Sequence, residues 1–73
     1  MTNNEKIKFL AENVFDVDES EVNPDMILEE LDFWDSMSKL SLVSFFDEQF
    51  GKVLKGEEIK SFKTIQDILN AMN

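Results

Sequence analysis

The chain has 73 residues, of which 42% are apolar, a length that predicts one small domain over residues 1–73. It contains neither cysteine nor histidine, which excludes disulfides, most zinc sites and every catalytic triad that needs an imidazole base. Sixteen acidic residues against seven basic ones give a formal charge of −9, which argues against nucleic acid and anionic membranes and favours partners with basic surfaces. The first dozen residues contain no uninterrupted apolar stretch, so we expect no signal peptide, no membrane span and a cytoplasmic location.

The N-terminal segment has the pattern of an amphipathic helix. Thr2, followed three residues later by Glu5, predicts a capping box. The apolar residues behind it follow the i, i+3, i+4, i+7 spacing of a helix: Ile7, Leu10, Ala11 and Val14. We therefore place a first helix over residues 3–15.

Residues 16–34 have no periodic pattern, and loops of this length in small domains tend to be functional. We expect separated apolar residues to anchor the loop on the bundle: Val17, Val22, Ile27, Leu28 and Leu31. Asp16, Asp18 and Ser20 alternate as in a calcium loop, but Glu21 stands in place of the required glycine and Ile27 in place of the closing glutamate. The sequence thus predicts no specific metal site and leaves open only weak ion binding by this acidic loop. The acidic pairs at 29–30 and 57–58 are expected to be solvated faces, so we predict no catalytic groups and no enzyme.

A second helix is predicted over residues 36–50, because Asp35 is a suitable N-cap and Gly51 follows as a stop signal. A short turn or helix follows at residues 56–61, and Thr64 then caps a last helix. The core positions of that helix are Ile65, Ile68, Leu69 and Met72. Nothing alternates with period two. The predicted fold is all-α: a small four-helix bundle with three main helices, one short helix and a long loop between the first two.

The helical projection of residues 36–50, at about 100° per residue, separates two faces. Four residues share the core-facing arc: Leu42, Val43, Phe46 and Phe50. Lys39 also lies in this arc and should extend its ammonium group outward. Met37 lies nearly opposite, so we expect it to be exposed for a partner, whereas Leu40 suits either a partner or a neighbouring helix. Phe45 lies off the arc and should pack against the long loop or the first helix.

Ser36 is the candidate modification site. A serine at a helix start is usually only a cap, but Asp35 can serve as the cap here and leave the Ser36 hydroxyl pointing outward. The free N–H groups and the positive end of the helix favour an anion at this position, which suits a covalently attached phosphate. Because the chain has no histidine to take its proton, Ser36 cannot act as a catalytic nucleophile. Another protein would have to install the group.

The residues around Ser36 carry a family resemblance. The run LDFWDSM at residues 31–37 leads into the apolar helix, DEQFG at 47–51 closes it, and EEI at 57–59 and TIQDI at 64–68 follow. The chain resembles, over nearly its whole length, an acyl carrier protein, the small four-helix domain that carries 4′-phosphopantetheine on the serine of an Asp-Ser-Leu motif. The resemblance implies that a phosphopantetheinyl transferase attaches this group from coenzyme A to Ser36, and that Asp35 and Met37 complete the motif. It also implies an interior that can shelter a cargo chain, lined by Leu42, Val43, Phe46, Phe50, Phe62 and Ile65.

One departure from the family pattern concerns the surface after the motif. Fatty-acid-synthesis carriers have many acidic residues there, which dock onto basic partner surfaces. Here the positions are occupied by Ser38, Lys39, Ser41 and Ser44, and acidic residues return only at 47–48. The resemblance therefore implies a carrier for a specialised pathway rather than for housekeeping fatty-acid synthesis.

The docking surface for acyl-loading and acyl-transfer enzymes is expected around the motif. Its candidate residues are Met37, Leu40, Ser41, Ser44, Asp47 and Glu48. We expect a monomer. Two alternatives stay open: an aminoacyl or peptidyl carrier, and a helical adaptor in which Ser36 is only a cap.

Overall fold

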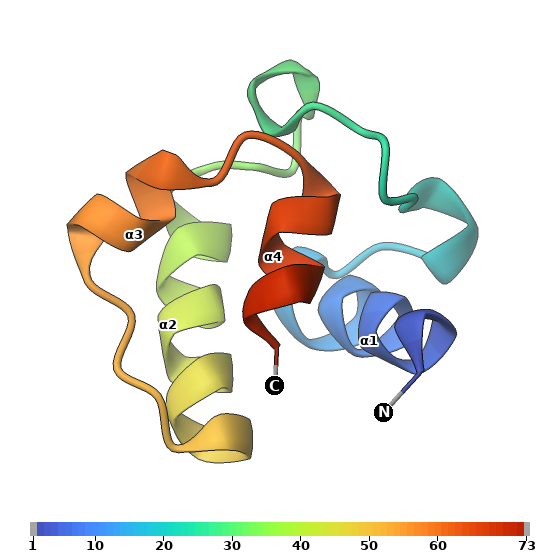
Figure 1. Ribbon diagram of the computed structural model, residues 1–73. Coiled ribbons are helices and arrows are strands. Elements are labelled where there is room, and N and C mark those ends of the chain that lie inside the picture. Colours follow the sequence, from blue (N-terminus) through green and yellow to red (C-terminus); the bar gives the residue numbers. More distant parts are fainter. Residues whose placement is uncertain (1, 73) are drawn as a thin grey trace.

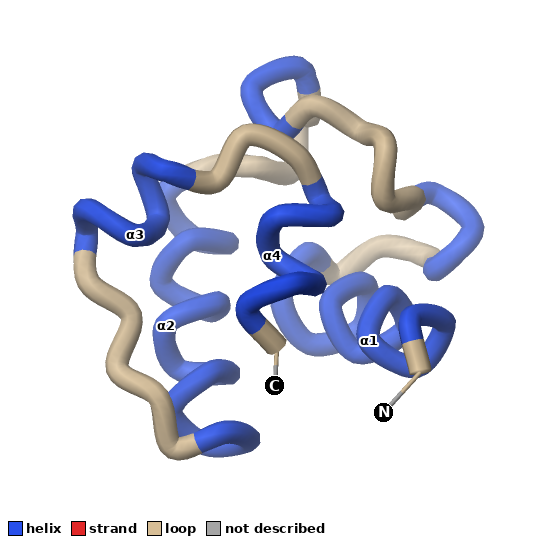
Figure 2. Tube along the Cα trace, in the orientation of Figure 1, coloured by secondary structure: helices blue, strands red, loops and turns tan. Residues whose placement is uncertain are grey.

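The computed structural model describes residues 2–72, which fold into four helices around one core (Figure 1). The helices are α1 (Asn3–Leu10), α2 (Ser36–Phe50), α3 (Gly56–Ser61) and α4 (Ile65–Ala71). Figure 2 shows helices and loops but no strand in this part of the chain, where an isolated bridge joins Ile27 and Thr64. The all-α prediction is therefore confirmed, and α2 has the predicted bounds. None of the helices within residues 2–72 combines the length and apolar character needed to cross a bilayer.

The first helix begins as predicted but ends differently. Thr2 and Glu5 form the expected capping box, with Glu5 N donating to Thr2 Oγ1 at 3.2 Å. The α-helical part ends at Leu10, and Ala11–Phe15 form a wider segment of π-helix, here called the π turn, which ends at Asp16 in the left-handed conformation with φ 55°. Three side chains of this segment are buried in the core: Ala11, Val14 and Phe15.

The loop between α1 and α2 contains two short 3₁₀ turns, Glu19–Glu21 and Leu28–Glu30. Most predicted anchors hold, since Val22 and Leu28 are buried and Val17 and Leu31 are half-buried. The prediction for Ile27 was wrong. Its side chain is 46% exposed. Ile27 has an extended backbone that forms a bridge with Thr64, and the side chain that enters the core here is that of the next residue, Leu28.

The core gathers side chains from α1, the loop, α2 and α4. Figure 1 shows α4 crossing the middle of the molecule with α2 on one side and α1 on the other. The completely or almost completely buried large side chains are Leu10, Leu28, Leu42, Phe46, Ile65, Ile68, Leu69 and Met72. Each contributes about 1.5–3 kcal/mol through burial. Val43 and Phe50 lie half-buried at the edge of the predicted arc, and the Phe46 and Phe50 rings are 5.5 Å apart.

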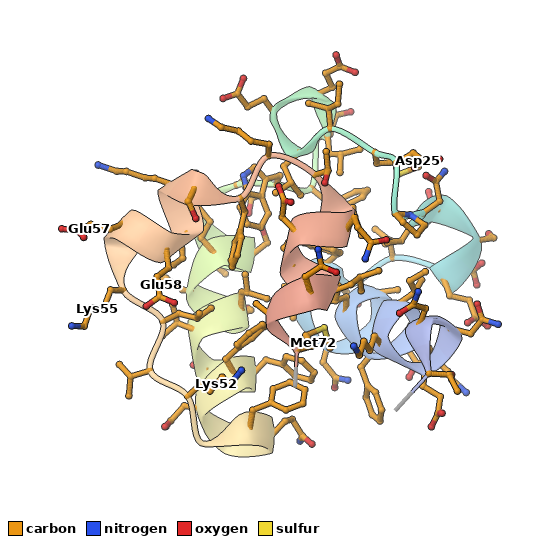
Figure 3. All side chains as sticks on the ribbon, viewed as in Figure 1. Asp25, Lys52, Lys55, Glu57, Glu58 and Met72 are labelled. Atoms are coloured by element: carbon orange, nitrogen blue, oxygen red, sulfur yellow. The ribbon has the colours of Figure 1, made fainter. Side chains whose placement is uncertain are left out.

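Two lysine side chains hold the C-terminal end of α4. Lys6 Nζ on α1 donates to Leu69 O at 3.2 Å, and Lys52 Nζ donates to Ala71 O at 3.0 Å. Figure 3 shows Lys52 reaching inward near Met72 from the loop after α2. Ammonium groups stabilise this helix end because its last carbonyl groups lack partners within the helix and carry its negative pole.

Candidate functional site

The start of α2 is held by a reciprocal capping box. Asp35 Oδ1 accepts a hydrogen bond from Ser38 N, and Ser38 Oγ accepts one from Asp35 N, both at 2.9 Å. The Ser38 hydroxyl in turn donates to Asp35 O at 3.0 Å. Asp35 has an extended backbone, with φ −125° and ψ −174°, as N-cap residues usually do. The prediction that Asp35 caps α2 is confirmed.

Ser36 is the first residue of α2, and its side chain is exposed. Within residues 2–72, no hydrogen bond engages the Ser36 hydroxyl or the backbone N–H groups of Ser36 and Met37. These groups lie at the positive end of a 15-residue helix, where an anion is stabilised. An exposed hydroxyl beside free donors fits the phosphate ester of a phosphopantetheine group.

Ser38 is buried, with 4% of its side chain exposed. The expectation that this position forms part of the surface after the motif was therefore wrong. The capping box turns the Ser38 hydroxyl back onto Asp35, so this side chain points towards the cap and not out from the surface. Ser41 is half-buried and Ser44 is exposed, so those two positions do lie at the surface.

A groove of about 370 Å³ lies between α2 and the π turn. Met37 and Leu40 are 75% and 68% exposed, so the predicted exposure of Met37 is confirmed and Leu40 is open as well. Phe45 is buried at the bottom, and its ring lies 6.3 Å from that of Phe9, which confirms packing against α1. Five of the six candidate docking residues line the groove, whereas Asp47 is exposed outside it. The lining residues are Asn13, Met37, Leu40, Ser41, Ser44, Phe45, Glu48 and Gln49.

A second cavity, of about 500 Å³, lies between α3 and the start of α2. Its lining residues are Glu29, Trp34, Lys39, Gly56, Ile59, Lys60 and Phe62. Of the residues that the resemblance assigned to a cargo-sheltering interior, Phe62 lines this cavity. The others belong to the core or its edge: Leu42, Val43, Phe46, Phe50 and Ile65.

Sequence reasoning missed one feature of the groove and one of the second cavity. Asn13 reaches the groove from the π turn, where its Nδ2 donates to Phe9 O at 3.1 Å, and an α-helical projection of residues 3–15 gave no sign of it. Lys39 Nζ extends outward as expected but lies 5.5 Å from the centre of the Trp34 ring, a cation–π distance. The positions of Trp34 and Lys39 on either side of Ser36 were a usable signal for that contact.

The acidic loop forms local caps. Asp18 and Glu21 make a capping box around the first 3₁₀ turn, and Ser20 Oγ also donates to Asp18. The hydrogen bonds from Ser20 hold the pKa of the Asp18 carboxyl below its ordinary value. No group of three or more potential metal ligands comes together within the described residues. Glu57 extends into solvent, as predicted for the acidic pairs (Figure 3).

Comparison with known proteins yields relatives that align over nearly the whole chain. This chain is 32% identical over 69 residues to the acyl carrier protein of Thermosynechococcus vestitus, and the alignment covers 94% of this chain and 85% of that protein. It is 33% identical over 69 residues to acyl carrier protein 2 of Ralstonia nicotianae, covering 93% and 84%. The chain belongs to the acyl carrier protein family. The acyl carrier protein of Petrotoga mobilis is 31% identical over 70 residues, covering 94% and 81%. No protein-family model and no solved structure matches the chain.

Family membership confirms the resemblance found around Ser36. Acyl carrier proteins are carriers rather than enzymes, so this chain is a carrier and not an enzyme. The family generally carries a 4′-phosphopantetheine group, which a transferase attaches, and works with the enzymes of fatty-acid metabolism. The adaptor alternative, in which Ser36 would be only a cap, loses its support.

Proposed function

We propose that this acyl carrier protein holds acyl groups as thioesters on a 4′-phosphopantetheine arm attached to Ser36. The observation that carries the proposal is the capping of α2 by Asp35 and Ser38, which leaves the Ser36 hydroxyl exposed and without a hydrogen bond within residues 2–72. Attachment would join Ser36 Oγ to the phosphopantetheine phosphate of coenzyme A. The hydroxyl proton and adenosine 3′,5′-bisphosphate would leave. The arm supplies a terminal thiol, and tethering gives its cargo a high effective concentration at each partner enzyme.

We further propose that residues 1–73 work as one monomeric carrier domain. Because attachment consumes coenzyme A and needs a phosphopantetheinyl transferase, the proposed location is the cytoplasm. The groove around Met37 and Leu40 would receive partner enzymes, since two large apolar side chains are exposed there within one turn of Ser36. Ser41 and Ser44 give this surface little charge near the attachment residue, which supports a specialised pathway over housekeeping fatty-acid synthesis.

Incubation with coenzyme A and a broad-specificity phosphopantetheinyl transferase tests the attachment. Intact-mass spectrometry should show one added phosphopantetheine on the unaltered chain and none on Ser36→Ala. Ser61→Ala, at an exposed serine that ends α3, is the matched control and should load fully. Loading that persists in Ser36→Ala would refute the proposal.

A charge-addition experiment tests the pathway assignment. Replacing Ser41 and Ser44 with glutamate should speed association with fatty-acid-synthesis enzymes at low salt, and the gain should shrink as salt screens it. Met37→Ala should slow transfer to a cognate enzyme without lowering the melting temperature. Equal service to fatty-acid enzymes by the unaltered chain and a housekeeping carrier would contradict the specialised role.

The cargo identifies which carrier type is present. Mass spectrometry of the protein from its native host, with the arm and cargo intact, should find an acyl group on Ser36. An amino acid in its place would establish the aminoacyl-carrier alternative.

A further inference from the structure

The cavity between α3 and the start of α2 has an apolar wall close to Ser36. Trp34, Ile59 and Phe62 form this wall, and each is half-buried. The volume of about 500 Å³ is in the range of small-ligand sites. Trp34 precedes Ser36 by two residues and Lys39 follows it by three, so the cavity lies beside the proposed attachment residue.

The rim of this cavity is basic on an acidic protein. Lys39 from α2 and Lys60 from α3 line it, and Glu29 supplies the one carboxylate among its described lining residues. The whole chain has 16 acidic and seven basic residues, so the local balance is the reverse of the global one. Neither ammonium group has an ion-pair partner within residues 2–72, and the recorded neighbour of Lys39 Nζ is the Trp34 ring.

We infer that this cavity receives a dicarboxylic acyl group, with its methylene groups on the apolar wall and its free carboxylate between Lys39 and Lys60. The inference rests on the proposed loading of Ser36 and adds the chemical class of the cargo. Two ammonium groups give a carboxylate charge-assisted hydrogen bonds. A methyl-ended chain would gain only the apolar contacts. An aminoacyl group would bring a like charge towards the lysines.

The test loads the full chain with two acyl groups of equal length. Hydrolysis-resistant amide analogues of adipoyl- and hexanoyl-coenzyme A are attached by the transferase, and intact mass verifies complete loading. Trp34 is the single tryptophan of the chain, so its fluorescence reports on the cavity directly. The adipoyl form should show the larger shift of Trp34 emission and the higher melting temperature. The difference between the two forms should shrink with added salt.

Lysine substitutions separate the rim from general charge. Lys39→Met and Lys60→Met should each reduce the difference between the adipoyl and hexanoyl forms, and the double variant should abolish it. The control variants are Lys8→Met on α1 and Lys55→Met, whose side chain extends away from the molecule in Figure 3. Both controls should keep the difference.

Two results would overturn the inference: equal responses to the two acyl groups, or a full difference in the Lys39→Met/Lys60→Met double variant. Both require loaded protein. Failure of Ser36 to load would instead refute the proposed function, so the two failures are distinguishable.

Discussion

The first turns of α2 and α4 are built in the same way. Each helix follows a capping residue, Asp35 or Thr64, and in each a side chain three positions on bonds back to the cap. Both boxes satisfy backbone N–H groups that have no partner inside their own helix. The two helix starts differ in what surrounds them.

At the start of α4 the remaining backbone N–H groups donate hydrogen bonds to carbonyl groups of the long loop. Ile65 N donates to Met26 O, and Gln66 N donates to Pro24 O, both at 3.0 Å. The Ile65 side chain is completely buried. This helix start therefore holds the loop against the bundle.

At the start of α2 the equivalent backbone N–H groups have no such loop carbonyl partners within residues 2–72. Ser36 is exposed, and the N–H groups of Ser36 and Met37 have no partner within residues 2–72. The same kind of local cap can thus begin a helix that holds a loop against the bundle, as at α4, or one whose first residue is accessible for attachment, as at α2. The two helix starts differ in what covers them: loop carbonyl groups accept hydrogen bonds from the first N–H groups of α4, and within residues 2–72 none does so at α2.

The two helix starts should differ most in stability when the side chain of the first helical residue is truncated to alanine. Ile65→Ala should lower the free energy of unfolding by roughly 2–5 kcal/mol, because it removes buried methyl groups from the core. Ser36→Ala should change the same quantity by less than about 0.5 kcal/mol, as expected for an exposed site. Urea denaturation of both variants measures this. A cost above about 1 kcal/mol for Ser36→Ala would mean that its hydroxyl caps the helix.

A smaller and equal effect should follow from removal of the two boxes. Ser38→Ala and Thr64→Ala should each cost about 1 kcal/mol, since each loses side-chain bonds to its capping partner or its helix. Ser41→Ala, at a half-buried site on α2 outside the box, is the control and should cost less. If Ser38→Ala proved as mild as Ser41→Ala, the α2 box would not stabilise the helix.

The helix starts and the core could be predicted because their signals are local. Asp35, Thr64 and Gly51 act on neighbouring backbone groups, and Gly51 ends α2 in the left-handed conformation with φ 63°, which glycine adopts without steric cost. The face of α2 follows from the 3.6-residue period, which separated the exposed Met37 from the buried Leu42.

The features that sequence reasoning missed depend on competing or distant contacts. A 3.6-residue period cannot reveal the π turn, because that turn has a different period. The family pattern placed Ser38 at the surface after the motif, because such a pattern does not show which side chains bond back to the backbone. The outward side chain of Ile27 accompanies a backbone bridge to Thr64, a partner distant in sequence. The cavity beside Ser36 combines residues from the loop, α2 and α3 and has no local signal.

The smallest expected effect is a pH dependence at the start of α4. Asp67 Oδ2 accepts hydrogen bonds from Lys63 N at 2.8 Å and Thr64 N at 3.1 Å. These bonds hold the pKa of the Asp67 carboxyl below its ordinary value of 3.8. A lowered carboxyl pKa stabilises the folded state above pH 3.8, and this contribution is lost as the pH falls through the pKa of the folded state.

Chemical denaturation across this acidic range should therefore show a shallower loss of stability in Asp67→Asn than in the unaltered chain. Asparagine keeps a carbonyl acceptor but does not titrate. Some slope should remain, because the carboxyls of Glu5 and Asp18 also have lowered pKa values, from hydrogen bonds with Thr2 and Ser20. Thr64→Ala is the matched control: it weakens the cap and removes one smaller cause of the lowered pKa of Asp67, but it keeps the titrating group and the two backbone donors that lower this pKa most. Its curve should therefore lie lower and keep most of the slope. An unchanged slope in Asp67→Asn would show that the carboxylate at the start of α4 does not contribute to the acid sensitivity of the fold.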